Sequence, residues 1–278
     1  PFLGHEAEPI AKTENPKKVM VIGGGVAGLC AAFIAKEKGH EVTLYEAGDV
    51  LGGNMRLAAY PPGKGDITNM IRSYIHRCQK DGVKIVMNCE VTPELIKEEK
   101  PDSVIIATGS KTLILPIEGI DNPAIIHGSD LLDGKRPAGK KVLVVGGGMV
   151  GCETAAFLGE QEHDVTVIEF RDTVGADVIH EHRVYLMKDF EDYGIKEITG
   201  AKVCKFYEDG VEYETADGVR HETRGYDSVI LSMGFRNYNP LEEKIKDLVP
   251  ETHVIGDAIR ARRALDATKE AYEVASRL

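Results

Sequence analysis

The residues best suited to chemistry in this chain are two clusters of glycines, each followed by a lone acidic residue. In the first cluster, Gly23, Gly25 and Gly28 form a G-x-G-x-x-G pattern, and Glu46 lies 18 residues beyond the last glycine. The first glycine of such a pattern permits a tight turn out of a strand, the second lets the backbone approach a pyrophosphate, and the third lets a helix pack closely on a sheet. Free N–H groups at the helix start favour an anion, and the later carboxylate can accept hydrogen bonds from ribose hydroxyls. The spacing predicts a dinucleotide site.

The same pattern returns later in the chain. Segments 18–47 and 141–170 align without a gap at an offset of about 123 residues. The second copy consists of Gly146, Gly148, Gly151 and Glu169. Each copy is a β-branched run, a glycine turn, a stretch of helix formers and a second β-branched run ending in Glu, which indicates a βαβ unit. Short apolar runs ending in glycine, Val104–Gly109 and Val229–Gly234, follow at nearly the same offset, so the duplicated element is a whole domain.

A single glycine pattern is also compatible with ordinary turn chemistry, and a single strand-end Glu with a solvated side chain. Two copies with identical spacing favour nucleotide binding. The carboxylate of Glu169 would accept a ribose 2′-hydroxyl and repel a 2′-phosphate, which predicts NADH in preference to NADPH. Arg171 leaves an alternative open, because its side chain could reach a 2′-phosphate or simply point to solvent.

Composition narrows the class of protein. A length of 278 residues suits two domains. The net charge of -11, with no basic run, argues against nucleic acid as a partner. The apolar stretches are far shorter than the roughly 20 residues of a membrane helix. Five scattered cysteines without a C-x-x-C pair suggest neither a disulfide framework nor a metal cage, and they fit a reducing cytoplasm. The polar start of the chain has no apolar signal core and reads as a linker over 1–16.

With further motifs, the chain resembles the two-dinucleotide-binding-domain flavoproteins. These motifs are Leu51-Gly52-Gly53, Ala107-Thr108-Gly109 and His253-Val254-Ile255-Gly256-Asp257, the last followed by a helix starting around Ala264 and Leu265. The resemblance implies an α/β fold with two Rossmann-like domains, the second inserted into the first. It implies an FAD-binding domain of 17–115 plus 250–278 and an NADH-binding domain of 116–249. Hydride would pass from nicotinamide C4 to flavin N5, and the last helix would stabilise the reduced flavin.

The resemblance also implies which residues contact each of the two small-molecule dinucleotides. Asp257 is expected beside the ribityl chain and pyrophosphate of FAD. No catalytic residue is assigned. Glu153 resembles a family residue near the nicotinamide, although an acidic residue is also favourable at a helix N-terminus for its own sake. The expected FAD contacts are Gly23, Gly25, Ala27, Gly28, Glu46, Ala47, Gly52, Gly53, Asn54, Arg56, Val91, Ala107, Thr108, Gly109, Gly256, Asp257 and Ala264. The expected NADH contacts are Gly146, Gly148, Met149, Val150, Gly151, Glu153, Glu169, Phe170, Arg171 and Gly234.

A closer resemblance is to the C-terminal half of the 2,4-dienoyl-CoA reductase and enoate reductase group, iron–sulfur flavoenzymes related to old yellow enzyme. It rests on Pro1–Glu8, Leu57–Pro62 and Gly256–Ala267. It implies that the chain is a fragment, and that a missing N-terminal catalytic domain with FMN and an iron–sulfur cluster receives the electrons. The absence of cysteine from Asn54 to Tyr60 argues against thiol–disulfide chemistry. Two alternatives stay open: a noncatalytic domain that holds only ADP, and a stand-alone reductase of an electron-carrier protein.

A few residues invite chemistry that a plainer reading also explains. His180, Glu181 and His182 suggest a metal, but residues at i and i+2 do not share a helix face, so we expect a solvated helix. Cys30 and Cys152 fall within the helices after the glycine turns, where we expect them to pack as small apolar residues.

Overall fold

The chain divides into two compact units in the computed structural model, which describes residues 9–278. Unit 1 comprises the described residues up to Ala59, then Asp66–Lys111 and Arg236–Leu278. Unit 2 comprises Tyr60–Gly65 and Thr112–Phe235. The Pro1–Glu8 segment, on which part of the resemblance rests, lies outside the described residues.

Unit 1 is built on a five-stranded parallel sheet in the order β15-β4-β1-β2-β3. The strands are β1 (Lys18–Ile22), β2 (Glu41–Tyr45), β3 (Lys84–Val86), β4 (Ser103–Ile106) and β15 (Glu251–Val254). The glycine turn follows β1, which lies between β2 and β4. Apolar, largely β-branched residues fill β1 and β4 because helices cover both faces of the sheet.

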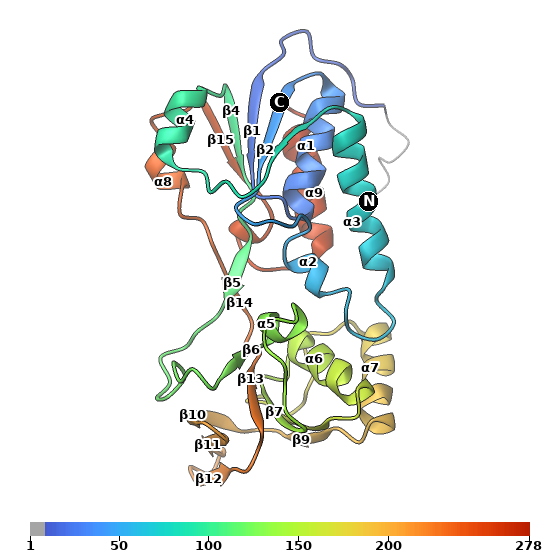
Figure 1. Ribbon diagram of the computed structural model, residues 1–278, viewed down its shortest axis with the longest axis vertical. Helices are drawn as coiled ribbons and strands as arrows, with labels where there is room; N and C mark the ends of the chain where they lie inside the picture. Colours follow the sequence, from blue (N-terminus) through green and yellow to red (C-terminus); the bar gives the residue numbers. More distant parts are fainter. Residues whose placement is uncertain (1–8) are drawn as a thin grey trace. The chain divides into compact units, whose positions relative to one another are not determined.

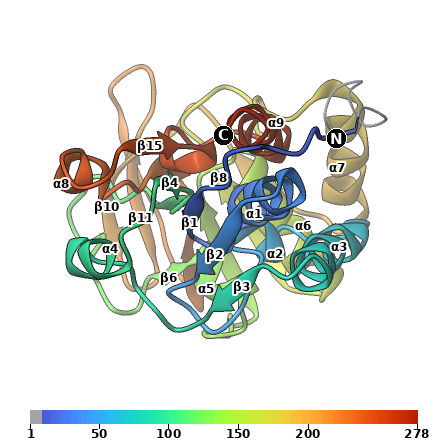
Figure 2. The same cartoon turned by 90° about the horizontal axis from the view of Figure 1, so that it is seen from above.

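The helices of unit 1 form two layers, visible in Figures 1 and 2. On one face lie α1 (Val26–Lys38), α3 (Asp66–Lys80) and α9 (Ala264–Ala275), which share a core with Val19 and Val21 of β1. On the other face lie α4 (Pro93–Glu99) and α8 (Glu242–Ile245), packed on the alternate strand residues. The small side chains of α1 let α9 approach closely, so the last helix of the chain packs on the first. A short helix, α2 (Asn54–Leu57), and a 3-10 turn, η1 (Gly256–Ala258), lie beside the glycine turn.

Unit 2 repeats this plan with a parallel sheet in the order β6-β13-β7-β8-β9. Its strands are β6 (Ile126–His127), β7 (Lys141–Val145), β8 (Asp164–Ile168), β9 (Lys196–Ile198) and β13 (Ser228–Leu231). Its helices are α5 (Gly128–Leu132), α6 (Met149–Glu160) and α7 (His180–Asp192). An antiparallel sheet of β10 (Lys202–Tyr207), β11 (Gly210–Glu214) and β12 (Arg220–Thr223) packs on the other face through Phe206 and Val211.

The two sheets correspond strand by strand, with β1 equivalent to β7, β2 to β8 and β4 to β13. Their edge strands differ in origin. β15 of unit 1 comes from the last part of the chain, whereas β6 of unit 2 precedes its own glycine turn. The prediction of two Rossmann-like units, the second inserted into the first, is confirmed.

The boundaries differ from those expected. The chain enters unit 2 at 112 and returns to unit 1 at 236, within the paired strands β5 (Ser110–Thr112) and β14 (Phe235–Asn237), whereas the sequence suggested 116 and 250. The early return has a packing reason, because Leu241, Ile245 and Val249 are buried in the core of unit 1 against Ile96. These apolar residues carry no motif, so the sequence analysis placed them in the NADH-binding domain of 116–249 instead.

No helix in the described part of the chain is both long and apolar enough to span a membrane.

Candidate dinucleotide sites

The first site is organised by Glu46, directly after β2. Its Oε2 accepts a hydrogen bond from Gly24 N at 2.7 Å, and its Oε1 accepts one from Gly48 N at 2.7 Å. A carboxylate offers about four lone-pair positions, so two remain for ligand hydroxyls. The contact with Gly24 fixes the carboxylate against the glycine turn, where it could accept hydrogen bonds from ribose hydroxyls.

The glycines of the first turn are needed for different reasons. Gly23 has φ +106°, a left-handed conformation that favours glycine, and any side chain there would overlap the carbonyl of Ala107. A methyl group on Gly28 would overlap the carbonyl oxygen of Gly23. Gly25 is unlike both, because a methyl group there meets nothing within 4 Å. The open space at Gly25 is a cradle that a ligand phosphate fits, whereas Gly23 and Gly28 serve the fold.

A hydrogen-bonded network joins three motifs of unit 1 that are distant in sequence. Asn54 Nδ2 donates to the carbonyl of Ser110 at 3.2 Å, and Ser110 Oγ donates to Asp257 Oδ2 at 2.9 Å. The other carboxylate oxygen, Asp257 Oδ1, accepts from Arg262 N at 3.0 Å. The network brings the residue after Gly52-Gly53, the residue after Gly109 and the C-terminal Gly-Asp pair to one end of the sheet. Sequence reasoning missed Ser110, although it directly follows a glycine that was assigned.

The turn at Gly256 is fixed by α9. Gly256 has φ +63°, and its N–H donates to Glu270 Oε2 at 2.7 Å. A methyl group on Gly256 would lie 3.0 Å from the Cβ of Ala27, so α1 passes directly beneath the turn. Glu270 also pairs with Arg262. The sequence did not predict Glu270. A helical side chain that accepts a hydrogen bond from a neighbouring turn carries no recognisable motif.

The second site reproduces the first almost atom for atom. Glu169 Oε2 accepts from Gly147 N at 2.6 Å, and Oε1 accepts from Arg171 N at 2.8 Å. Gly146 has φ +105°, and a methyl group on Gly151 would overlap the Gly146 carbonyl. The duplication seen in the sequence is therefore a duplication of hydrogen-bonding geometry.

One feature of the second site has no counterpart in the first. Asp177 Oδ1 accepts a hydrogen bond from Met149 N, the first N–H of α6, at 2.9 Å. The Asp177 carboxylate also lies 3.3 Å from where a methyl group on Gly148 would be. The sequence reasoning did not select Asp177.

Glu153 lies in the second turn of α6 with its side chain only 6% exposed. Its carboxylate pairs with the ammonium of Lys64, which belongs to the short 60–65 segment of unit 2. His182 Nε2 of α7 lies 3.4 Å from the same carboxylate oxygen. Glu153 is thus held as a buried charge with two basic neighbours. The expectation of a solvated helix is correct for His180 and Glu181, which are exposed. It is wrong for His182, which is partly buried because α7 packs on α6.

Among the described residues, no cluster of three or more His, Cys, Asp or Glu side chains could hold a metal ion.

Other predicted contacts surround the two carboxylates. Ala47 and Phe170 directly follow Glu46 and Glu169, and both are exposed, Phe170 by 69%. The side chain of Arg171 is also exposed. Val91, by contrast, is 5% exposed and packs in the core, so a ligand would meet its backbone rather than its side chain.

The remaining predicted residues lie on the turns and helix starts. Thr108 donates its hydroxyl to the carbonyl of Tyr238, and Gly109 accepts from Tyr238 N at 2.9 Å, so the crossover after β4 is tied to the strand returning from unit 2. Gly234 has φ +103° and accepts from Leu113 N. Val150 lies in the first turn of α6, Ala264 begins α9, and Arg56 lies in α2.

The cysteines in the two glycine-motif helices are packed side chains, as expected. Cys30 and Cys152 are both fully buried, and burial raises the pKa of each thiol to about 12. Burial likewise raises the pKa of Cys78 to about 12. Thiols with such pKa values stay protonated at neutral pH and are poor nucleophiles.

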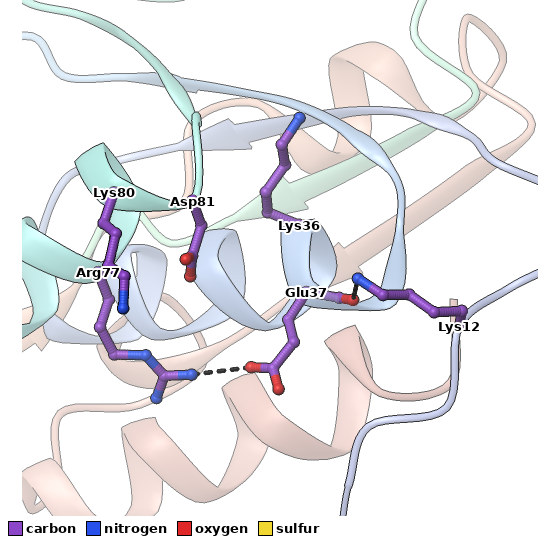
Figure 3. Close-up of a pocket in the computed structure, with 6 residues that line it drawn as sticks. All are labelled: Lys12, Lys36, Glu37, Arg77, Lys80 and Asp81. Carbon is purple, nitrogen blue, oxygen red and sulfur yellow. Dashed lines mark hydrogen bonds and ion pairs between the residues drawn. The ribbon is translucent and has the colours of Figure 1, made fainter.

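A cavity of about 410 Å³ lies at the opposite end of unit 1, and Figure 3 shows the side chains that line it. It is lined by Lys12, Lys36, Glu37, Arg77, Lys80 and Asp81. Glu37 bonds Arg77 at 2.8 Å through its side chain and accepts from Lys12 through its carbonyl. The cavity lies at the C-terminal end of α1, a helix about 20 Å long, so it is separate from the glycine turn at the other end.

Comparison with known proteins agrees with this geometry. The pyridine nucleotide-disulphide oxidoreductase family model matches residues 17–255. The chain belongs to this family. It is 33% identical over 282 residues to cinnamate reductase of Clostridium sporogenes, covering 100% of the chain and 42% of that protein. It is 34% identical over 277 residues to bilirubin reductase of Mediterraneibacter gnavus, covering 98% and 43% respectively. Among solved structures, 2-naphthoyl-CoA reductase superposes with a TM-score of 0.92 at 32% identity, covering 97% of the chain and 41% of that chain.

Family membership and the paired sites identify the chain as an FAD- and NAD(P)H-binding oxidoreductase module, and they confirm the resemblance to enoate reductase-like flavoenzymes. The chain spans less than half the length of these relatives.

Proposed function

We propose that the chain binds FAD on unit 1 and NADH on unit 2, takes hydride from NADH onto the flavin, and passes electrons to a separate FMN- and iron–sulfur-containing domain. That domain would reduce an activated alkene of the enoate or acyl-CoA type. The observation that carries the proposal is the pair of strand-end carboxylates, Glu46 and Glu169, each fixed by two backbone N–H groups beside a glycine turn.

The residues of unit 1 fit FAD. Gly25 offers open space to a pyrophosphate at the N-terminus of α1, and Glu46 keeps free lone pairs for a ribose. Asp257 is held by Ser110 and the Arg262 backbone, and the resemblance implies that it lies beside the ribityl chain of FAD. Bound flavin would supply the hydride-accepting centre at N5 and split the electron pair for a one-electron acceptor.

The residues of unit 2 support NADH over NADPH. The Glu169 carboxylate is fixed by Gly147 and Arg171 backbone groups, so it cannot easily turn away from a 2′-phosphate. Charged hydrogen bonds to ribose hydroxyls contribute about 1.5–3 kcal/mol each, and NADPH loses them. A preference for NADH of at least about tenfold follows from a difference of 1.4 kcal/mol.

The nature of the electron acceptor rests on the relatives. The names cinnamate reductase and 2-naphthoyl-CoA reductase describe reduction of a conjugated double bond or ring, and both proteins are more than twice as long as this chain. The buried side chains of Cys30, Cys78 and Cys152 leave no exposed cysteine pair near Asn54, which supports an acceptor other than a disulfide.

The central test is anaerobic reduction of FAD-reconstituted protein by NADH. Blue absorbance should bleach with NADH and recover on adding a one-electron dye. A protein that binds FAD but is not reduced by either coenzyme would refute the proposed function.

Coenzyme choice has its own test. Glu169→Ala should weaken NADH binding and narrow or reverse the preference, while Glu197→Ala removes an exposed charge of the same unit as a control. Equal use of NADH and NADPH by the unaltered protein would mean that Arg171, rather than Glu169, meets the ribose.

A further inference from the structure

The N-terminus of α6 holds a carboxylate of the chain itself. Met149 N donates to Asp177 Oδ1 at 2.9 Å, and the two Asp177 carboxylate oxygens lie 3.3 and 3.5 Å from a methyl position on Gly148. Free N–H groups and the positive end of the helix dipole make this point of a glycine-turn helix the binding site for a phosphate. An internal anion therefore lies on a donor that a coenzyme pyrophosphate would use.

The loop that carries Asp177 is fixed on both sides. Gly175 N donates to the Gly147 carbonyl at 2.7 Å, and Arg183 Nη2 donates to the Val174 carbonyl at 3.1 Å. Val178 is buried against the core of unit 2. Asp177 itself is exposed, so its carboxylate can turn to water without burying a charge. The loop is held in place, and the side chain is the part that can move.

Unit 1 provides an internal comparison. The offset of about 123 residues that aligns the two glycine motifs places Asn54 opposite Asp177. The backbone is equivalent, because Gly52 N donates to the Gly24 carbonyl at 2.8 Å, as Gly175 does to Gly147. Yet Asn54 is uncharged and donates its amide to Ser110, and a methyl group on Gly25 meets nothing within 4 Å. The same scaffold leaves the first site open and places an anion on the second.

We propose that Asp177 is an affinity-setting residue that competes with the coenzyme pyrophosphate for the N-terminus of α6. This inference rests on the proposed binding of NADH to unit 2. Binding would require the Asp177 carboxylate to release Met149 N and to remain near a pyrophosphate of like charge, so both effects weaken the coenzyme. A flavin stays bound through many turnovers, whereas the nicotinamide coenzyme must leave after each one. The carboxylate in unit 2 and the amide in unit 1 match these two requirements.

The test is the dissociation constant of NADH for the full chain, followed by the fluorescence of NADH itself. Asp177→Asn gives unit 2 the residue that unit 1 has at the same place. We expect it to lower the Kd about tenfold, equivalent to about 1.4 kcal/mol. The affinity for ADP-ribose, which carries the pyrophosphate, should rise to a similar extent. The affinity for adenosine, which carries no phosphate, should not change. Asp172→Asn removes the same charge from the same exposed loop and should change the Kd less than about twofold.

The NADH affinity separates this role from simple helix capping. Asparagine and serine accept a hydrogen bond at a helix N-terminus about as well as aspartate does, so capping alone predicts an unchanged thermal midpoint and an unchanged Kd in both variants. Asp177→Ser, which keeps a hydroxyl acceptor, serves as a second uncharged variant if Asp177→Asn folds poorly. An unchanged or higher Kd in the folded variants, with the wild type binding NADH, would overturn the inference alone. Failure of the wild type and all variants to bind either coenzyme would overturn the proposed function with it.

Discussion

Two glycines on the same turn should respond in opposite ways to the same substitution. Gly25 and Gly28 lie three residues apart at the start of α1, and each can be replaced by Ala. At Gly25 the backbone has φ −73° and ψ −178°, which alanine adopts freely, and the added methyl meets nothing within 4 Å. At Gly28 the methyl would lie far closer than 3.0 Å to the carbonyl oxygen of Gly23.

The magnitudes follow from these contacts. Gly25→Ala should change the stability of the ligand-free protein by less than about 1 kcal/mol, because alanine restricts the unfolded chain but is a poorer N-cap residue for α1 than glycine. Gly28→Ala forces a backbone shift in a packed core, which typically costs about 1–3 kcal/mol, and the rigid carbonyl favours the upper end. At roughly 2–4 °C per kcal/mol, the melting temperature should fall by roughly 6–12 °C.

The affinity for FAD should be affected most directly at Gly25, the position where the substitution costs the fold least. The methyl of Gly25→Ala occupies the space of the pyrophosphate and removes a charged backbone contact worth about 1.5–3 kcal/mol, so FAD affinity should fall about ten- to a hundredfold. The assay pairs flavin fluorescence titration of flavin-free protein with thermal unfolding without flavin.

The predictions for Gly25→Ala and Gly28→Ala can be refuted separately. If Gly25→Ala binds FAD as tightly as the wild type, the pyrophosphate does not cross this turn, and the assignment of unit 1 fails. If Gly28→Ala melts at the wild-type temperature, the close contact with Gly23 does not limit the fold.

Further predictions concern buried groups. Lys64→Met removes one of the two basic neighbours of buried Glu153 and should lower the free energy of unfolding by about 3 kcal/mol in urea titrations, whereas Lys64→Arg should restore most of it. The pKa of His40 is lowered from 6.5, first by burial and then by Lys17 and Lys38, so the unfolded state binds the extra proton. Stability should therefore fall as pH drops below 6.5, by at most about 1.4 kcal/mol per pH unit, and His40→Asn should flatten this slope below pH 6.5 in urea titrations at each pH. A thiol reagent on folded protein at pH 8 should modify Cys89 and Cys204 before the buried thiols of Cys30, Cys78 and Cys152, and equal rates would contradict the burial.

The parts of the sites predicted from the sequence are those that the backbone itself imposes. Gly23 and Gly146 require left-handed φ values, and Glu46 and Glu169 follow strands whose length is visible in the apolar pattern. Because of these requirements, particular residue types recur at a fixed spacing in the sequence. In the structure, the glycines lie in turns and the carboxylates lie at strand ends, as the spacing predicted.

The parts that were missed act through side chains that any helix or loop could carry. Glu270 meets Gly256 only because α9 packs on α1, and Lys64 meets Glu153 only because a short segment of the first half of the chain joins unit 2. Asp177 was accessible in principle, since extending the repeat alignment past Phe170 pairs it with Asn54. The segments that align without a gap end at Ala47 and Phe170, so the difference between Asn54 and Asp177 lies beyond them.

The edge strand of unit 1 has a consequence for the order in which the protein is made. Unit 2, including its 60–65 segment, is complete once residue 235 has been synthesised, and its sheet can close at that point. Unit 1 lacks β15, Asp257 and α9 until residues 251–275 have been synthesised, although its glycine turn is made before any part of unit 2. Unit 1 thus begins before unit 2 and closes after it. Until α9 has been synthesised, the face of α1 that packs on α9 in the folded protein stays exposed. This is the most extensive contact that α1 makes with another element.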